Sequence, residues 1–172
     1  MSAAPTIREA TAPEDIASAR TLFVEYAQWL GVDLCFQGFD AELATLPGAY
    51  ARPRGRLLLA GPPGGAFGCI ALRPLDSVAG GSAPDVGEVK RLYVQPGARN
   101  GGWGRRLAER VIADARGIGY AELKLDTLEW MTRARALYGA LGFRTCAPYY
   151  DNPLAGVVYM SLALDAAARV TR

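Results

Sequence analysis

The fold is most clearly indicated by residues 87–107, which read GEVKRLYVQPGARNGGWGRRL. Gly87 to Val94 is a short apolar and β-branched run, typical of a strand. An apolar stripe at three- and four-residue steps then predicts a helix from Gly102 to Arg116. Leu123 to Thr127 is a second strand-like run. The order strand, helix, strand predicts a β-α-β unit.

Helices and strands also alternate outside this unit. Thr11-Ala-Pro-Glu14 has the spacing of a capping box and predicts the start of a helix that ends near Gly31. The other expected elements are strands over Ile7–Ala10, Leu57–Ala60, Ala66–Leu72 and Val157–Leu164, helices over Asp40–Leu46 and Met131–Leu141, and a loop over Asp76–Asp85. Hairpins on both sides of one crossover predict a mixed α/β sheet with helices on both faces.

Length and composition favour one domain over residues 1–172, with 51% hydrophobic and 21% charged residues. A net charge of +2 argues against binding to nucleic acid. The chain has no histidine, which excludes a Ser-His-Asp triad, a Cys-His pair and a His-ligated metal site. Three widely spaced cysteines without CxxC suit a reducing cytosol and no zinc cluster. Without a signal peptide or a membrane-length apolar run, we expect a cytoplasmic protein that binds neither metal nor membrane.

The loop between the predicted strand and helix is the candidate site. The first turn of a helix has backbone N–H groups without intrahelical partners, and glycines let a ligand approach them. Arg99, Arg105 and Arg106 add positive charge at the same place, so the loop suits a pyrophosphate. From the glycines alone, a simple turn beside a solvated arginine face is an equally good interpretation.

Two other phosphate-binding motifs fit this loop less well. A Walker A loop requires Gly-Lys-Ser/Thr, whereas Gly104 is followed by two arginines. A dinucleotide fingerprint requires a third glycine where Leu107 stands, although Asp126 lies at a suitable distance for a ribose contact. NAD binding therefore stays open as a minor alternative.

The same residues resemble a known family. EVKRLYVQPGARNGGWGRRL resembles the acetyl-CoA-binding motif of the GNAT acetyltransferases, R/Q-x-x-G-x-G/A, which here runs from Arg99 to Gly104. Ala134 to Phe143 resembles the family's second signature, and the order of elements along the chain also fits. LCFQGF at 34–39 is similar to a bacterial small-molecule branch. The resemblance implies a twisted, mostly antiparallel sheet in which two central strands splay apart around the pantetheine arm.

The resemblance also implies which residues bind acetyl-CoA. The strand backbone would pair with pantetheine, and the loop would hold the pyrophosphate. The expected cofactor residues are Leu92, Tyr93, Val94, Arg99, Asn100, Gly101, Gly102, Trp103, Gly104 and Arg105. Asn100 and Trp103 depart from the usual motif, and Met131 stands where many relatives have an asparagine that contacts the cofactor.

Two residues are candidates for catalysis. Periodicity alone places Tyr138 in the core, whereas the resemblance implies that its phenol donates a proton to the CoA sulfur. Glu88 is the candidate base, because strand alternation puts it on the face of Lys90, Leu92 and Val94. A strand bulge would change that face, and an ion pair of Glu88 with Lys90 or Arg91 is an equally good interpretation.

For the acceptor, the resemblance points to the first helix-loop-helix and to the loop before the last strand. The candidate residues there are Trp29, Phe36, Gln37, Phe39, Tyr149, Tyr150 and Asn152, of which we expect Trp29, Phe36 and Tyr150 to bind the substrate. The two phenylalanines equally suit a role in fixing the loop to the sheet. Arg91 would bind a substrate carboxylate or form an ion pair with Glu88.

The sequence thus favours an N-acetyltransferase that moves acetyl from acetyl-CoA to a primary amine of a small molecule by direct attack in a ternary complex. Two alternatives stay open: a catalytically silent acyl-CoA-binding regulatory module, and a protein N-acetyltransferase. The even charge balance supplies no acidic groove for a peptide substrate. The resemblance also admits a homodimer, although no sequence feature indicates the oligomeric state.

Overall fold

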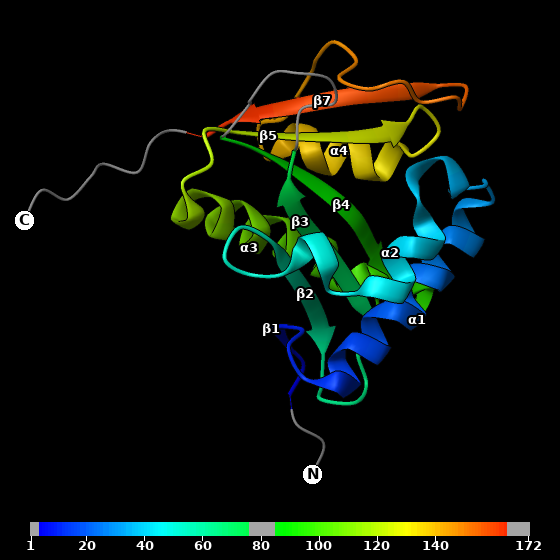
Figure 1. Ribbon diagram of the computed structural model, residues 1–172, viewed down its shortest axis with the longest axis vertical. Helices are drawn as coiled ribbons and strands as arrows, with labels where there is room; N and C mark the ends of the chain where they lie inside the picture. Colours follow the sequence, from blue (N-terminus) through cyan, green and yellow to red (C-terminus); the bar gives the residue numbers. More distant parts are fainter. Residues whose placement is uncertain (1–3, 76–84, 165–172) are drawn as a thin grey trace, which may run out of the picture.

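The computed structural model describes residues 4–75 and 85–164, which form one seven-stranded sheet in the order β1-β2-β3-β4-β5-β7-β6 (Figure 1). The strands are β1 (Thr6–Glu9), β2 (Arg56–Gly61), β3 (Gly68–Pro74), β4 (Val86–Val94), β5 (Glu122–Leu128), β6 (Arg144–Thr145) and β7 (Val157–Ala163). The helices are α1 (Pro13–Leu30), α2 (Phe39–Thr45), α3 (Trp103–Ile118) and α4 (Thr132–Ala140), with short 3₁₀ helices η1 (Cys35–Gln37), η2 (Gly48–Tyr50) and η3 (Pro96–Gly101). β4 and β5 are parallel and the other neighbouring strands are antiparallel. This confirms the predicted mixed, mostly antiparallel sheet.

The sheet separates two apolar layers. Figure 1 shows that helices cover both faces of the sheet. Leu58 and Ala60 of β2 pack in the core under α3 and α4, while Leu57 and Leu59 pack in the core under α1 and α2. All four side chains are at most 1% exposed, so β2 is buried on both faces. Helices on both faces of the sheet are therefore confirmed.

The ends of the long helices follow local chemistry. α1 ends at Leu30, and Gly31 takes the left-handed conformation with φ of 69°, as the sequence predicts. Its beginning differs from the prediction. Ala12 is the N-cap and makes no side-chain hydrogen bond, so the capping box over Thr11 to Glu14 is wrong. Pro13 begins the helix instead, where its missing N–H has no intrahelical acceptor to lose.

The central feature is the parting of β4 from β5. The two strands pair over three positions, from Val86 opposite Glu122 to Glu88 opposite Lys124. Beyond these positions β4 stays with β3, and β5 stays with β7 up to Leu128. The predicted splay of the central strands is confirmed, and it opens toward the carboxyl ends of both strands.

A bulge in β4 changes which side chains share a face. Cys69 and Ala71 of β3 pair with Tyr93 and Lys90, so β4 carries one extra residue over this step. Arg91 accommodates it with φ of 60°. The prediction that Glu88, Lys90, Leu92 and Val94 share a face is wrong, because Val94 and Leu92 pack in the α3 core. Lys90 and Arg91 instead both point to η1, where each donates to Gln37.

Three further points concern the remaining elements. β6 is two residues long and was not predicted, because two residues cannot show a period. The predicted loop over Asp76–Asp85 lies, except for Asp85, outside the described residues. None of the helices in the described part of the chain is long and apolar enough to span a membrane.

Candidate active site

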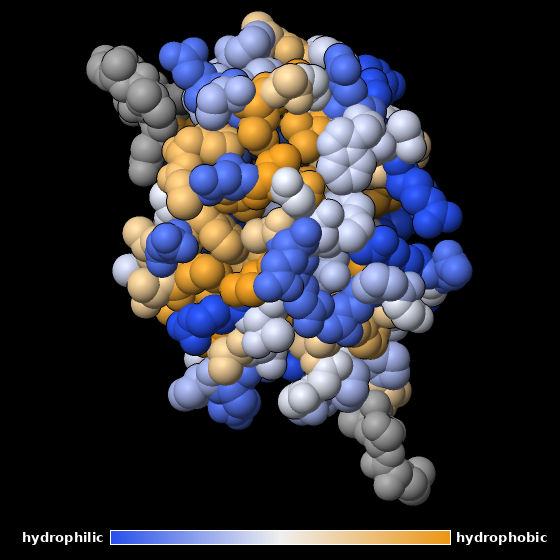
Figure 2. Space-filling model, turned by 90° about the vertical axis from the view of Figure 1, so that its right-hand side faces the viewer, coloured by the Kyte–Doolittle hydropathy of each residue, from blue (hydrophilic) through white to orange (hydrophobic). Residues whose placement is uncertain are grey.

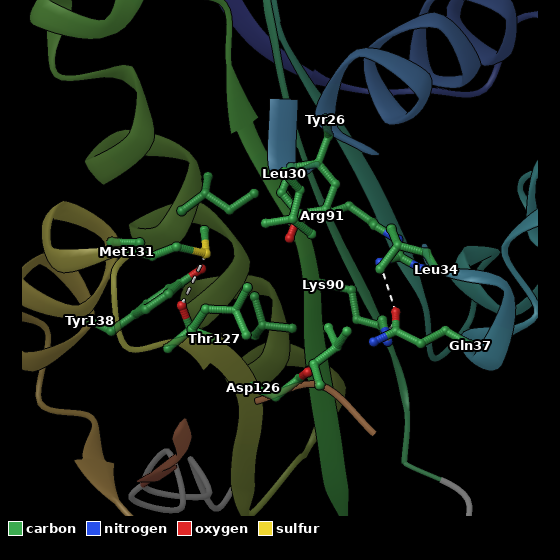
Figure 3. Close-up of a pocket in the computed structure, with 15 residues that line it drawn as sticks. Tyr26, Leu30, Leu34, Gln37, Lys90, Arg91, Asp126, Thr127, Met131 and Tyr138 are labelled. Atoms are coloured by element: carbon green, nitrogen blue, oxygen red, sulfur yellow. Dashed lines mark hydrogen bonds between the residues drawn. The ribbon is translucent and has the colours of Figure 1, made fainter. Parts of the chain in front are cut away.

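The parting of β4 and β5 creates a narrow cavity of about 50 Å³, enough for a few water molecules (Figure 3). Both strands contribute to its walls, together with α1, η1, α4 and the segment before β7. Its lining comprises Tyr26, Leu30, Leu34, Gln37, Val89, Lys90, Arg91, Leu92, Asp126, Thr127, Leu128, Met131, Ala134, Tyr138 and Leu154. One side of the cavity is thus apolar, while Lys90, Arg91 and Asp126 bring charge to the other.

Tyr138 enters this cavity from α4. Figure 3 shows its side chain reaching toward Met131 and Thr127, and the Thr127 Oγ1 to Met131 Sδ distance is 3.5 Å. The residue is 7% exposed, and its ring packs edge-on against Phe143 with centroids 5.5 Å apart. Burial raises the pKa of the phenol above its ordinary value, so the proton stays on the oxygen at neutral pH. The side chain is thus a core residue that also forms part of the cavity wall.

The main chain at the N-terminus of α3 offers an anion site. Gly102 is the N-cap, with φ of 72°, and no side chain caps the helix. The first N–H groups of the helix, through Arg105, therefore have no intrahelical acceptor. A Cβ at Gly104 would meet only Leu137 Cδ2, at 3.8 Å, whereas a Cβ at Gly101 would lie 2.9 Å from the Trp103 ring. Gly104 thus leaves open space beside these amides.

Three arginines surround the same loop, each with a partner. Arg99 donates from Nε to the Val94 carbonyl at 2.9 Å, and its guanidinium lies 5.0 Å from the Trp29 ring. Arg105 pairs with Glu109 on the exposed surface, and Arg106 lies over Trp103. Arg99, predicted for the cofactor, and Trp29, predicted for the substrate, are therefore neighbours.

The remaining predicted cofactor residues border the opening of the sheet. Leu92 lines the cavity, while Tyr93 and Val94 pair with Cys69 and Gly68 on the β3 side. Their other edge faces the gap left by β5. Asn100 is exposed in η3.

Glu88 does not border the cavity. It is 2% exposed, and its Oε1 lies 2.8 Å from Arg73 Nη2 and 3.3 Å from Lys90 Nζ. Burial alone would raise the pKa of this carboxyl, but the two cations outweigh burial and the pKa lies below its ordinary value. Lys90 and Arg91 are the alternative ion-pair partners that the sequence predicts for Glu88. In the structure Lys90 is a partner, and the second partner is Arg73 rather than Arg91.

Arg91 is held by side chains of η1 and α2. Its Nε donates to Glu42 Oε2 at 2.8 Å, and its Nη1 donates to Gln37 Oε1 at 2.9 Å. Tyr50 donates to Glu42 Oε1 at 2.6 Å and fixes that carboxylate from behind. Arg91 thus has its ion pair with Glu42, 49 residues away in the sequence, rather than with Glu88.

Asp126 is a site residue that the acceptor analysis missed. Its Oδ2 accepts hydrogen bonds from Tyr150 Oη at 2.7 Å and Asn152 Nδ2 at 3.1 Å. Gln37 Nε2 donates to Tyr150 Oη at 3.2 Å and joins this group to η1. The alternation of LKLDTL over 123–128 was the available signal, because it puts Lys124 and Asp126 on one face. In the described residues, no cluster of three Cys, Asp or Glu side chains is placed to bind a metal ion.

Aromatic side chains lie at the outer edge of the site. Trp29 and Trp130 are 41% and 53% exposed, and their rings are 5.5 Å apart. They join the end of α1 to the segment after β5. Phe36 in η1 is 38% exposed and does not line the cavity. Figure 2 shows a broad apolar surface, bordered by hydrophilic residues, on the side of the molecule to the right in Figure 1.

Comparisons with known proteins agree with this geometry. A family model described as the acetyltransferase (GNAT) family matches residues 21–143. The chain is 39% identical over 154 residues to an uncharacterised N-acetyltransferase of Schizosaccharomyces pombe, over 89% of this chain and 91% of that protein. It is 40% identical over 116 residues to an IAA acetyltransferase of Azospirillum brasilense, over 66% and 69% of the two chains. The fold is similar to that of an acetyltransferase from Salmonella typhimurium determined with acetyl-CoA, with a TM-score of 0.66, 22% identity and coverage of 96% and 97%.

Proposed function

The chain belongs to the acetyltransferase (GNAT) family and is an acetyl-CoA-dependent N-acetyltransferase, and we propose that it acetylates a primary amine of a small molecule by direct attack. The observation that carries this proposal is the cavity between β4 and β5, with Tyr138 in its wall. The N-terminus of α3, which no side chain caps, comes after the carboxyl end of β4, where β4 and β5 have separated. Relatives occur in a yeast as well as in bacteria, so the small-molecule bacterial branch stays a prediction.

The proposed cofactor site uses main-chain groups above all. The free edge of Leu92 to Val94 would pair with the pantetheine amides, in the direction where β5 has left the ladder. The amides of Trp103, Gly104 and Arg105 would receive the pyrophosphate. A structural neighbour of the same fold was determined with acetyl-CoA, which supports acetyl-CoA as the cofactor. Arg99 donates from Nε to the Val94 carbonyl, and its Nη groups would be the donors available to a phosphate.

The proposed reaction needs three events at the cavity. The neutral amine attacks the thioester carbonyl carbon, so a C–N bond forms while the C–S bond breaks. The departing sulfur takes the phenolic proton of Tyr138, and the amine releases one proton that restores the phenol through water. The products are an amide and the free thiol of CoA. The Tyr138 phenol carries its proton at neutral pH and can donate it to the thiolate, although burial raises its pKa and so makes it a weaker acid.

Thermal unfolding with acetyl-CoA, CoA or NADH tests the cofactor part of the proposal. A ligand at one hundred times its dissociation constant stabilises the native state by about 2.7 kcal/mol, or roughly 5–10 °C for a domain of this size. We expect that rise with acetyl-CoA and CoA. A rise with NADH alone would contradict the proposal. Thiol release from acetyl-CoA in the presence of amines then tests the transfer itself.

A further inference from the structure

Resting on this proposed function, we infer that Asp126 anchors the amino group of the acceptor, and that the acceptor is an amine on an apolar skeleton with no carboxylate beside the nitrogen. Arylalkyl and branched alkyl amines are the matching class. The alternative, an amino acid, would need a free cation next to the amine-binding carboxylate.

Asp126 is the cavity carboxylate that has no cation of its own. Its two hydrogen-bond donors are neutral, Tyr150 and Asn152, and both donate to Oδ2. Within the described ranges, no Lys or Arg nitrogen comes within ion-pair distance of it, and Oδ1 accepts no side-chain hydrogen bond. A carboxylate held in place by neutral donors can accept a further hydrogen bond from the N–H of a neutral ligand amine.

The cations of the cavity have partners already. Arg91 makes two hydrogen bonds to Glu42, from Nε at 2.8 Å and from Nη2 at 3.2 Å. Lys90 is paired with Glu88 and also donates to Gln37 Oε1 at 3.2 Å. Arg91 and Lys90 are 5% and 7% exposed, so a substrate carboxylate would have to replace a buried carboxylate to reach either. Breaking a buried ion pair is strongly unfavourable.

Most of the rest of the wall is apolar, and its polar side chains, Tyr26, Gln37, Thr127 and Tyr138, are neutral. Leu30 and Leu34 come from the α1 side, and Leu128, Met131 and Leu154 face them. In Figure 3, Leu30 lies above and Met131 to the left of the cavity, Leu34 lies to the right beside Gln37, and Asp126 lies below. An anion against such a wall would lose its hydration without compensation, whereas an alkyl or aryl group gains from burial.

The cavity also brings the anchor and the acid together. Asp126 and Tyr138 line the same narrow cavity. An amine held at Asp126 would therefore attack the thioester carbonyl of acetyl-CoA while the thioester sulfur lies on the Tyr138 side of the cavity. The body of the acceptor would extend along the apolar wall.

Two pairs of acceptors that differ only by a carboxylate provide the test: phenethylamine against L-phenylalanine, and isoamylamine against L-leucine. Thiol release from acetyl-CoA gives kcat/KM for each, using the full wild-type chain. We expect each amine to exceed its amino acid by at least tenfold. Equal values, or a preference for the amino acids, would overturn the inference.

The binding measurement separates this inference from the proposed function. If acetyl-CoA stabilises the protein but neither amine is acetylated, the inference is wrong and the cofactor site stands. If acetyl-CoA does not stabilise the protein, the proposed function itself fails, and the inference fails with it.

Asp126→Asn tests the anchor, with Asp151→Asn, an exposed carboxylate in the segment before β7, as the matched control. We expect Asp126→Asn to raise the KM for phenethylamine at least tenfold while the stabilisation by acetyl-CoA stays at the wild-type value. Asp151→Asn should leave both unchanged. An unchanged KM in Asp126→Asn would overturn the assignment of the anchor.

Discussion

Replacing Tyr138 by phenylalanine removes one hydroxyl group and keeps the ring that packs against Phe143 at 5.5 Å. General acid catalysis contributes about 10²–10⁴-fold to a rate. An alkyl thiol has a pKa of about 8.5, so its anion is a tolerable leaving group without immediate protonation. We therefore expect the lower end of that range, a fall of about 100-fold in kcat, or about 2.7 kcal/mol in the activation barrier.

The assay is thiol release from acetyl-CoA with a saturating amine, together with thermal unfolding in the presence of acetyl-CoA. Tyr120→Phe is the matched control, because Tyr120 Oη donates to the Arg54 carbonyl at 2.9 Å and does not line the cavity. This control should lose about 1 kcal/mol of stability with no change in kcat. Tyr138→Phe should keep its stabilisation by acetyl-CoA.

Two results would refute the reasoning. A kcat within threefold of the wild type would show that the sulfur gains its proton elsewhere. A loss of stabilisation by acetyl-CoA would show that the hydroxyl binds the cofactor instead. The pH profile provides a further check, because burial raises the pKa of the phenol above 10. No alkaline loss of kcat from this group is expected below pH 10 in the wild type.

Two other predictions concern the cofactor loop and the buried ion pairs. Gly104→Ala should weaken acetyl-CoA binding about tenfold without loss of stability, because its Cβ enters the open space beside the α3 amides. The control Gly117→Ala, whose Cβ would have nothing within 4 Å, should add about 0.5–1 kcal/mol of stability and leave binding unchanged. Equal affinities of Gly104→Ala and the wild type for acetyl-CoA would contradict the anion site. Glu88→Gln should destabilise the protein by about 3–5 kcal/mol in urea unfolding at pH 7, against less than about 1 kcal/mol for the exposed Glu109→Gln. Because the folded pKa of Glu88 lies below 4.5, its contribution is present above that pH and lost as the pH falls through the folded pKa, so the difference between wild type and Glu88→Gln should shrink in acid; a constant difference would contradict this.

Local patterns predicted the regular elements well. The end of α1 at Gly31, the hairpin of β2 and β3, and the unit of β4, α3 and β5 depend on residues close in sequence. The parting of β4 from β5 followed from the family resemblance, since no residue type marks it. The false capping box has a simple cause. Threonine and glutamate at the right spacing permit such a cap, but Pro13 already fixes the first turn and the helix starts one residue too late for Thr11.

The candidate site was less accessible from the sequence. The bulge at Arg91 depends on pairing with β3, and it turns both Lys90 and Arg91 to η1. The partner of Arg91 is 49 residues away, and Gln37 meets Tyr150 across 113 residues. Charge pairing between such distant positions has no local signal. Residue types alone therefore indicated the segments of the acceptor site but not which charges neutralise one another.

The two sides of the cavity are encoded in different ways. The proposed cofactor side consists of main-chain amides at the edge of β4 and at the start of α3, which every residue except proline supplies. The proposed acceptor side consists of individual side chains from η1, β5 and the segment before β7. A point mutation can alter the second without touching the first. A duplicated copy of the gene could therefore change its amine in a few mutational steps while its acetyl donor is inherited unaltered.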